Sequence, residues 1–229
     1  FIFLINICMS TEYTQWTVDR IINTPPVNSE KLHVMDIENF MHPELYQKVQ
    51  QCVPNEWQNE ELPGRHGYHI GPNEQQEALR IATEYVYRSQ EVLDAIGNVM
   101  NMSSNVNVNQ PFMWMDTNKN SVHDVHVDHP SYYYTVQHSL AMDDEFAHTG
   151  TMFWEVDCAY DQAIDEGLDP TFGEDSTLVK MGHQMPYVPN RAYILPRSSK
   201  GWHSCPDLTK EPDHMQRIMI YLIATLKKS

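Results

Sequence analysis

The sequence predicts an α+β domain, mainly β, with helices packed on the outside of a β-sandwich or barrel. Over residues 73–99, apolar residues recur every three to four positions, as in a helix. From residue 105 the period falls to two, as in strands. Helical segments followed by strand-rich ones, without an internal repeat, are typical of one α+β domain. A chain of 229 residues is long enough to bury one such core.

The N-terminal residues 1–8 are interpreted separately. They are apolar, but they fall short of the roughly 20 residues that span a membrane and lack the basic start of a signal peptide. Met9 followed by Ser10 resembles a natural start. We therefore expect residues 1–8 to be an extra segment and residues 9–229 to form a single domain. The alternative is a short buried N-terminal strand.

Helices are expected in the first hundred residues. A strand over 32–37 precedes a helix that begins near Pro43, a residue favoured in the first helical turn. Prolines and glycines over 54–72 predict loops or short extended pieces. From Asn73, which is suited to a helix cap, to about Val99, apolar residues at three-to-four spacing predict one helix with a buried stripe.

Strands are expected after residue 100. The period-two pattern places them at 105–115, 132–142, 150–156, 191–195 and 216–226. The segment 157–185 is acidic and poor in strand signals. Asp157, Asp161 and Asp165 are four residues apart, but the alternate ligands and the glycine of a calcium loop are missing. We interpret this segment as a solvated short helix or a lid-like insertion.

The charge balance and the cysteines limit the classes of partner and compartment. Fifteen Lys and Arg against 31 Asp and Glu give a net charge of −16, so a nucleic-acid partner is not expected. An apolar share of 41% argues against a disordered chain. The four cysteines are widely spaced and form no CxxC pair. They predict reduced thiols in a cytoplasmic protein and no structural zinc site. A membrane partner is not expected, because the apolar residues 1–8 are too few to span a membrane.

Residues 123–129 contain three histidines and two aspartates, which are common metal ligands. On a strand, residues i and i+2 point the same way, so His126 and Asp128 can bind one ion together. A non-haem Fe(II) site needs a second histidine, and His203, just beyond the segment 192–196, is the candidate. His123 or His129 could replace His126, although neither has an aspartate two residues later.

These pieces occur in a recognisable order. They are Val34 to Phe40 with Pro43 to Leu45, His126-x-Asp128, Gly150 to Phe153, Asn190 to Pro196 with Trp202-His203, and Arg217 to Leu222. Over about 190 residues this ordered set resembles the 2-oxoglutarate and Fe(II)-dependent oxygenase superfamily, in its prolyl-hydroxylase-like branch. The resemblance implies a double-stranded β-helix, a jelly-roll or cupin-like barrel, whose larger sheet is buttressed by the helices near 43–52 and 73–99.

The resemblance also implies an activity. The chain would be a non-haem Fe(II) and 2-oxoglutarate-dependent dioxygenase that hydroxylates a peptidyl or small-molecule substrate. His126, Asp128 and His203 would hold the iron, 2-oxoglutarate would be the co-substrate, and ascorbate an optional addition. The acidic charge argues against the nucleic-acid-demethylating members of the superfamily.

Arg217 is the candidate for the far carboxylate of 2-oxoglutarate. It opens an apolar strand 14 residues after His203, and a planar guanidinium can donate two parallel hydrogen bonds to a carboxylate. The alternative is a strand-edge arginine that points into solvent. Tyr134 could add a hydrogen bond to the same carboxylate, or could be an ordinary core tyrosine. Met219 occupies a position where the family often has a small hydroxyl residue.

Two rival functions stay open at this stage. One is a non-catalytic jelly-roll binding module, and the other is a cupin-type metal enzyme that does not use 2-oxoglutarate. The sequence does not indicate the substrate or the oligomeric state.

Overall fold

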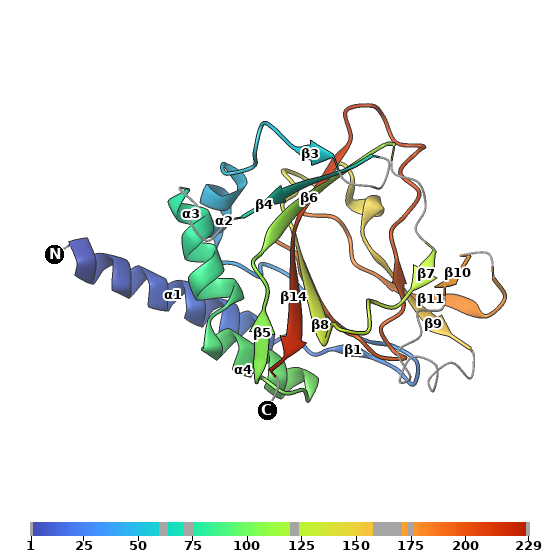
Figure 1. Cartoon of the computed structure of the whole chain (residues 1–229), viewed down its shortest axis with the longest axis horizontal. Coiled ribbons are helices and arrows are strands. Elements are labelled where there is room, and N and C mark those ends of the chain that lie inside the picture. The colour runs from blue at the N-terminus through green and yellow to red at the C-terminus, as the bar shows by residue number, and fades with distance from the viewer. Residues whose placement is uncertain are drawn as a thin grey trace.

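The computed structural model of the protein describes residues 2–59, 64–70, 76–119, 124–157, 171–173 and 176–227. For residues 2–10 and 59 it describes the backbone alone. Two antiparallel sheets make up most of these stretches, and the α-helices lie on one side of the larger sheet (Figure 1). The predicted α+β, mainly β architecture is therefore confirmed.

The larger sheet has nine strands within the described residues. Eight follow the order β1-β2-β12-β8-β14-β6-β4-β3, and β5 joins β14 outside this path. Their bounds are β1 Val27–Asn28, β2 His33–Ile37, β3 Gln58–Asn59, β4 Arg65–His69, β5 Val106–Val108, β6 Phe112–Thr117, β8 Tyr134–Ser139, β12 Ala192–Pro196 and β14 Gln216–Leu226. The predicted strand 216–226 is confirmed, and the strands predicted at 105–115, 132–142 and 191–195 contain β5, β6, β8 and β12.

The smaller sheet lies on the other side of the larger sheet from the α-helices (Figure 1). Its order in the described part of the chain is β10-β7-β13-β9-β11. The bounds are β7 Val125–His126, β9 Met152–Val156, β10 Thr171–Phe172, β11 Val179–Gln184 and β13 His203–Ser204. The strand predicted at 150–156 corresponds to β9.

Strand β11 corrects the interpretation of residues 157–185 as a solvated helix or insertion. The strand pairs with β9 through a register shift between Met181 and His183. It is an edge strand whose central residues 180–182 are exposed, so it has no alternation of apolar and polar residues to reveal it. Asp157 forms an ion pair with Lys31 at 2.8 Å, while Asp161 and Asp165 lie outside the described residues.

The helix predicted over 73–99 is interrupted. Within the described residues it consists of α3 Glu77–Ile81, a π-helix Ala82–Tyr87 and α4 Gln90–Met100. The amide of Arg88 donates to the carbonyl of Thr83, five residues back, and the backbone turns extended at Ser89. Asn73, the expected cap, lies outside the described residues. The predicted helix at Pro43 is confirmed as α2, Pro43–Gln50.

The N-terminal segment forms a helix that the sequence analysis did not predict. Helix α1 spans Ile2–Ile22, so the alternative of a short N-terminal strand is wrong. Tyr13, Thr17 and Ile21 are buried at a spacing of four, which places one face of α1 against the core. Among the described residues, no helix is both long and apolar enough to cross a membrane.

Alternation along β8 and β14 separates two interiors. Val136, Ile220 and Leu222 belong to the apolar cluster that the α-helices cover. Their neighbours in sequence, such as Gln137 and Tyr221, face the smaller sheet instead. The sheet therefore carries an apolar face for the helices and a more polar face toward β7 and β13.

Gly150 allows the smaller sheet to close on the segment before β12. A Cβ atom at this position would lie 1.6 Å from the carbonyl oxygen of Met185, so any side chain would displace backbone. The amide of Met185 donates to the carbonyl of Thr151 at 3.0 Å. The glycine that opens the predicted motif at 150–153 is thus required by close backbone approach.

His138 lies on the helix face of β8 and is fully buried. Its Nε2 lies 3.0 Å from Oδ1 of Asn190, which also accepts from the Met41 amide, so Nε2 carries the proton. Nδ1 accepts from the hydroxyl of Tyr87 at 2.6 Å. Burial lowers the pKa of His138 to about 4, although the bond to Asn190 favours the charged form.

This histidine predicts acid sensitivity. Its folded-state pKa lies below the ordinary value of 6.5, so the unfolded chain takes up the proton first as the pH falls. The contribution of His138 to the free energy of unfolding is complete above pH 6.5. It is lost as the pH falls toward 4, and amounts to roughly 3 kcal/mol. Urea unfolding at a series of pH values should show a shallower acid slope for His138→Gln, which cannot titrate. The exposed His69→Gln is the control, and parallel curves for wild type and His138→Gln would contradict the prediction.

Candidate metal centre

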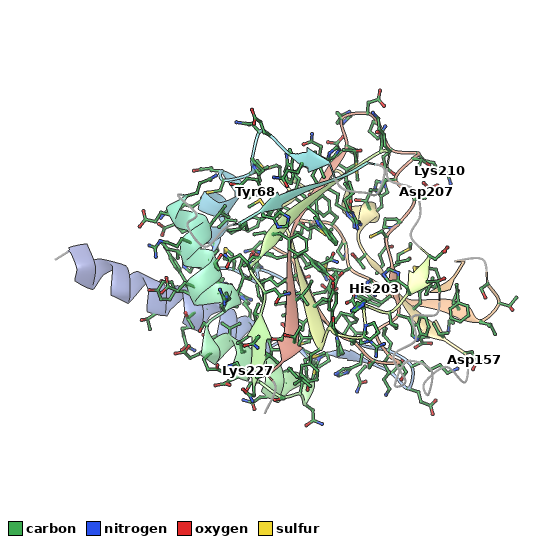
Figure 2. The ribbon with its side chains drawn as sticks, viewed as in Figure 1. Tyr68, Asp157, His203, Asp207, Lys210 and Lys227 are labelled. Carbon is green, nitrogen blue, oxygen red and sulfur yellow. The ribbon has the colours of Figure 1, made fainter. Side chains whose placement is uncertain are left out.

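The structure brings together the three residues predicted to bind a metal. Strands β7 and β13 pair so that His203 lies opposite His126. One ligand atom from each of His126, Asp128 and His203 can be chosen so that all lie within 4.8 Å of one another. The two imidazole rings are 4.4 Å apart, and Nε2 of His203 is 3.7 Å from Oδ1 of Asp128. Figure 2 shows His203 in the interior of the molecule, whereas Asp157 and Lys210 lie at its edge.

Backbone carbonyls fix the protonation of both imidazoles. Nδ1 of His126 lies 2.7 Å from the carbonyl oxygen of Asp124, and Nδ1 of His203 lies 3.1 Å from that of Gly201. A carbonyl oxygen can only accept, so each Nδ1 carries the hydrogen. Each Nε2 therefore keeps its lone pair for a metal, as metal-binding histidines require.

Electrostatics favour the ligand form of His126. Burial, and then the proximity of His203, lower the pKa of His126 to about 4. The imidazole is therefore neutral near pH 7, which is the form that binds a metal ion. Two neutral imidazoles and one carboxylate are the donor set of a non-haem Fe(II) site, so the residues fit this metal.

Asp128 is held from two strands of the larger sheet. The hydroxyl of Thr135 on β8 donates to Oδ2 at 2.8 Å, and the hydroxyl of Tyr221 on β14 donates to Oδ1 at 3.4 Å. Nε of Arg197 donates to the backbone carbonyl of Asp128 at 3.2 Å. The sequence analysis did not find these supports, because contacts from different strands leave no spacing signal.

Of the two alternative ligands, only His129 lies in the described part of the chain, and it is not brought into this group. His129 is exposed and its Nδ1 contacts the hydroxyl of Ser131 at 2.8 Å. His123 lies outside the described residues.

Tyr134 is not brought to the site. It belongs to the buried apolar cluster under the helices, together with Val136 and Leu222. Thr135, the next residue on β8, points to the metal side and contacts Asp128. Because successive residues of a strand face opposite ways, Tyr134 must face the helices, so its assignment to the co-substrate is wrong and the core alternative holds.

Arg217 is fully buried, so the alternative of a solvent-facing arginine is wrong. Its guanidinium donates to the carbonyl of Thr149 at 2.7 Å and to Sγ of Cys205 at 3.0 Å. Nη2 also lies 3.1 Å from Oδ2 of the fully buried Asp116. Asp116 in turn accepts two hydrogen bonds from Arg65, at 2.7 and 3.2 Å. The sequence analysis predicted neither Asp116 nor Arg65.

The arginine cluster and the metal ligands share one interior. The hydroxyl of Tyr193 on β12 is fully buried, and its pKa is raised by burial and by the proximity of Asp128 and Cys205, while the charge of Arg217 lowers it. Tyr193 therefore lies within electrostatic range of both groups. It is in register with Gln137 on β8, and Gln137 is in register with Tyr221 on β14.

Comparison with known proteins gives similarity in structure alone. No protein-family model and no curated protein sequence matches the chain. A prolyl hydroxylase from Trichoplax adhaerens, in complex with a hypoxia-inducible-factor peptide fragment, aligns with a TM-score of 0.57 and 12% identity, over 96% of this chain and 92% of that one. HygX from Streptomyces hygroscopicus, with nickel and 2-oxoglutarate bound, aligns with a TM-score of 0.58 and 8% identity, over 86% and 84%.

A prolyl-4-hydroxylase from Pseudomonas putida aligns with a TM-score of 0.51 and 11% identity, over 94% of this chain and 100% of that one. These alignments span nearly the whole of each chain, so they concern the entire domain rather than one motif. The chain therefore has the fold of the solved prolyl hydroxylases and other 2-oxoglutarate and Fe(II)-dependent oxygenases, which agrees with the superfamily that its sequence resembles.

Proposed function

We propose that this protein is a non-haem Fe(II) and 2-oxoglutarate-dependent dioxygenase of the hydroxylase type, built on a double-stranded β-helix. The observation that carries the proposal is the convergence of His126, Asp128 and His203, with both Nε2 atoms left free by backbone carbonyls. The fold shared with the solved oxygenases supports the same conclusion.

The residues of the chain have separate tasks in this proposal. His126, Asp128 and His203 would hold the metal ion, with two imidazoles and one carboxylate as its protein ligands. Thr135 and Tyr221 keep the carboxylate of Asp128 oriented. Arg217 binds the far carboxylate of 2-oxoglutarate. The bound Fe(II), with 2-oxoglutarate and oxygen, supplies the oxidising power for hydroxylation of a C–H bond.

The substrate class is a peptide or a small molecule. The Trichoplax hydroxylase was solved with a peptide fragment, and HygX was also solved with hygromycin B. A net charge of −16 disfavours nucleic acid. The four widely spaced cysteines, which form no CxxC pair, favour a cytoplasmic location.

One observation favours a second candidate, a cupin-type metal enzyme that does not use 2-oxoglutarate. Arg217 already has an anionic partner in Asp116. If that ion pair neutralised the guanidinium completely, a dicarboxylate would meet no net attraction. Binding measurements separate this candidate from the dioxygenase and from a non-catalytic module.

The first prediction concerns the metal. Isothermal titration calorimetry with Mn²⁺, a stand-in that does not react with oxygen as Fe(II) does, should show binding to the wild type. His126→Ala and His203→Ala should each weaken this binding by about 100-fold or more, since loss of a supporting contact alone costs about 10- to 100-fold. His129→Ala should bind like the wild type. If the wild type binds no metal, the non-catalytic module is the better description.

The second prediction concerns the co-substrate. Arg217→Gln should retain Mn²⁺ binding but lose 2-oxoglutarate binding by about 10-fold or more, because one charged hydrogen-bond partner of the carboxylate is removed. The exposed Arg80→Gln is the matched control. With Fe(II) and ascorbate, the wild type should also convert 2-oxoglutarate to succinate. A wild type that binds the metal but ignores 2-oxoglutarate would support the cupin-type enzyme instead.

A further inference from the structure

Three charged side chains form a row across the larger sheet. Arg217 on β14 is in register with Asp116 on β6, and Asp116 is in register with Arg65 on β4. Directly opposed residues of neighbouring strands point to the same face, so the three side chains meet. Oδ1 and Oδ2 of Asp116 take both hydrogen bonds from Arg65, and Oδ2 also contacts Arg217.

The charges in this row do not cancel. Among the described residues, two guanidinium groups share one carboxylate, and Sγ of the Cys205 thiol accepts from both, at 3.0 Å from Arg217 and 3.9 Å from Arg65. The charges of the two arginines and the aspartate alone leave one positive charge. Arg217 and Asp116 have no exposed surface, and the side chain of Arg65 is 9% exposed. A buried charge without a counter-charge is costly, so a structure that keeps this surplus is suited to an anion. Nε of Arg217 is also buried without a hydrogen-bond partner among the described residues.

A stack of side chains connects Arg65 to the metal ligands. The guanidinium carbon of Arg65 lies 4.3 Å from the ring centre of Trp114. The Trp114 ring stacks on Tyr221 at 4.7 Å and 13°, and the hydroxyl of Tyr221 donates to Asp128. The arginine cluster and the candidate metal ligands thus lie in the same interior. The stacked rings of Trp114 and Tyr221 connect Arg65 to Asp128.

We propose that Arg65 is a positioning residue that sets the charge of the co-substrate site: by holding Asp116, it leaves the positive charge of Arg217 for the far carboxylate of 2-oxoglutarate. This inference rests on the proposed function. Without Arg65, the carboxylate of Asp116 would neutralise the guanidinium of Arg217. The far carboxylate of 2-oxoglutarate would then approach an ion pair of zero net charge. Arg65 therefore determines that the site prefers a dicarboxylate over a 2-oxo acid with one carboxylate.

The test compares two 2-oxo acids on the Mn²⁺-loaded protein by calorimetry. 2-Oxoglutarate carries the far carboxylate, and 2-oxobutanoate has the same metal-binding end without it. The ratio of their affinities measures the contribution of the far carboxylate alone. Arg65→Gln should lower this ratio by about 10- to 100-fold, as expected for one charge removed a few ångströms away. The affinity for 2-oxobutanoate should change by less than about threefold.

A second substitution separates charge from structure. Arg65→Gln with Asp116→Asn removes one positive and one negative charge and restores the surplus, so the affinity ratio should return to within about threefold of the wild type. Arg65→Lys keeps the charge and should also keep the ratio, although it loses the paired hydrogen bonds. If Arg65→Gln fails to fold, these two variants decide the question.

The outcomes distinguish this inference from the proposed function. If the wild type with Mn²⁺ does not bind 2-oxoglutarate, both fail. If the wild type binds and Arg65→Gln weakens both acids equally, or the double variant stays as weak as the single one, the inference alone is overturned. In those cases Arg65 is a structural residue or contacts the carboxylate directly.

Discussion

The alternation of side chains along β8 and β14 is the constraint on which the rest of the structure depends. These neighbouring strands of the larger sheet present Val136, Ile220 and Leu222 to the helices and Thr135 and Tyr221 to the metal ligands. A shift of register by one residue would exchange the two faces, placing apolar side chains at the site and hydroxyls in the core. The fold and the site are thus specified by one pairing pattern.

Polar groups inside this protein are ordered by partners from other strands. Asp128 depends on β8 and β14, and Asp116 depends on Arg65 and Arg217 from the strands on either side. A half-satisfied buried network would cost more than an apolar core, so each member constrains the others. This dependence explains how residues far apart in sequence hold the metal ligands and the arginine cluster in one interior.

Much of the fold could be predicted because it follows local patterns. The almost wholly apolar run within 216–226 predicted β14, and the proline at 43 predicted the start of α2. The predictions failed where the local pattern was weak. The edge strand β11 has an exposed centre without alternation, and the π-helix at 82–87 inserts an extra residue that a simple helical period does not anticipate. Tyr134 was misplaced because its face depends on strand register.

The sequence by itself determined which residues are candidate metal ligands, because His126, Asp128 and His203 are recognisable from their chemistry and from the two-residue spacing of the first pair. It also indicated that Arg217 needs an anion, since a charge at the head of an apolar strand requires one. Only the tertiary structure decided that Asp116 is that partner and that Arg65 shares it. The reason is physical: the charge of a buried site is a sum over neighbouring strands, and cross-strand register is set by packing that no single segment contains.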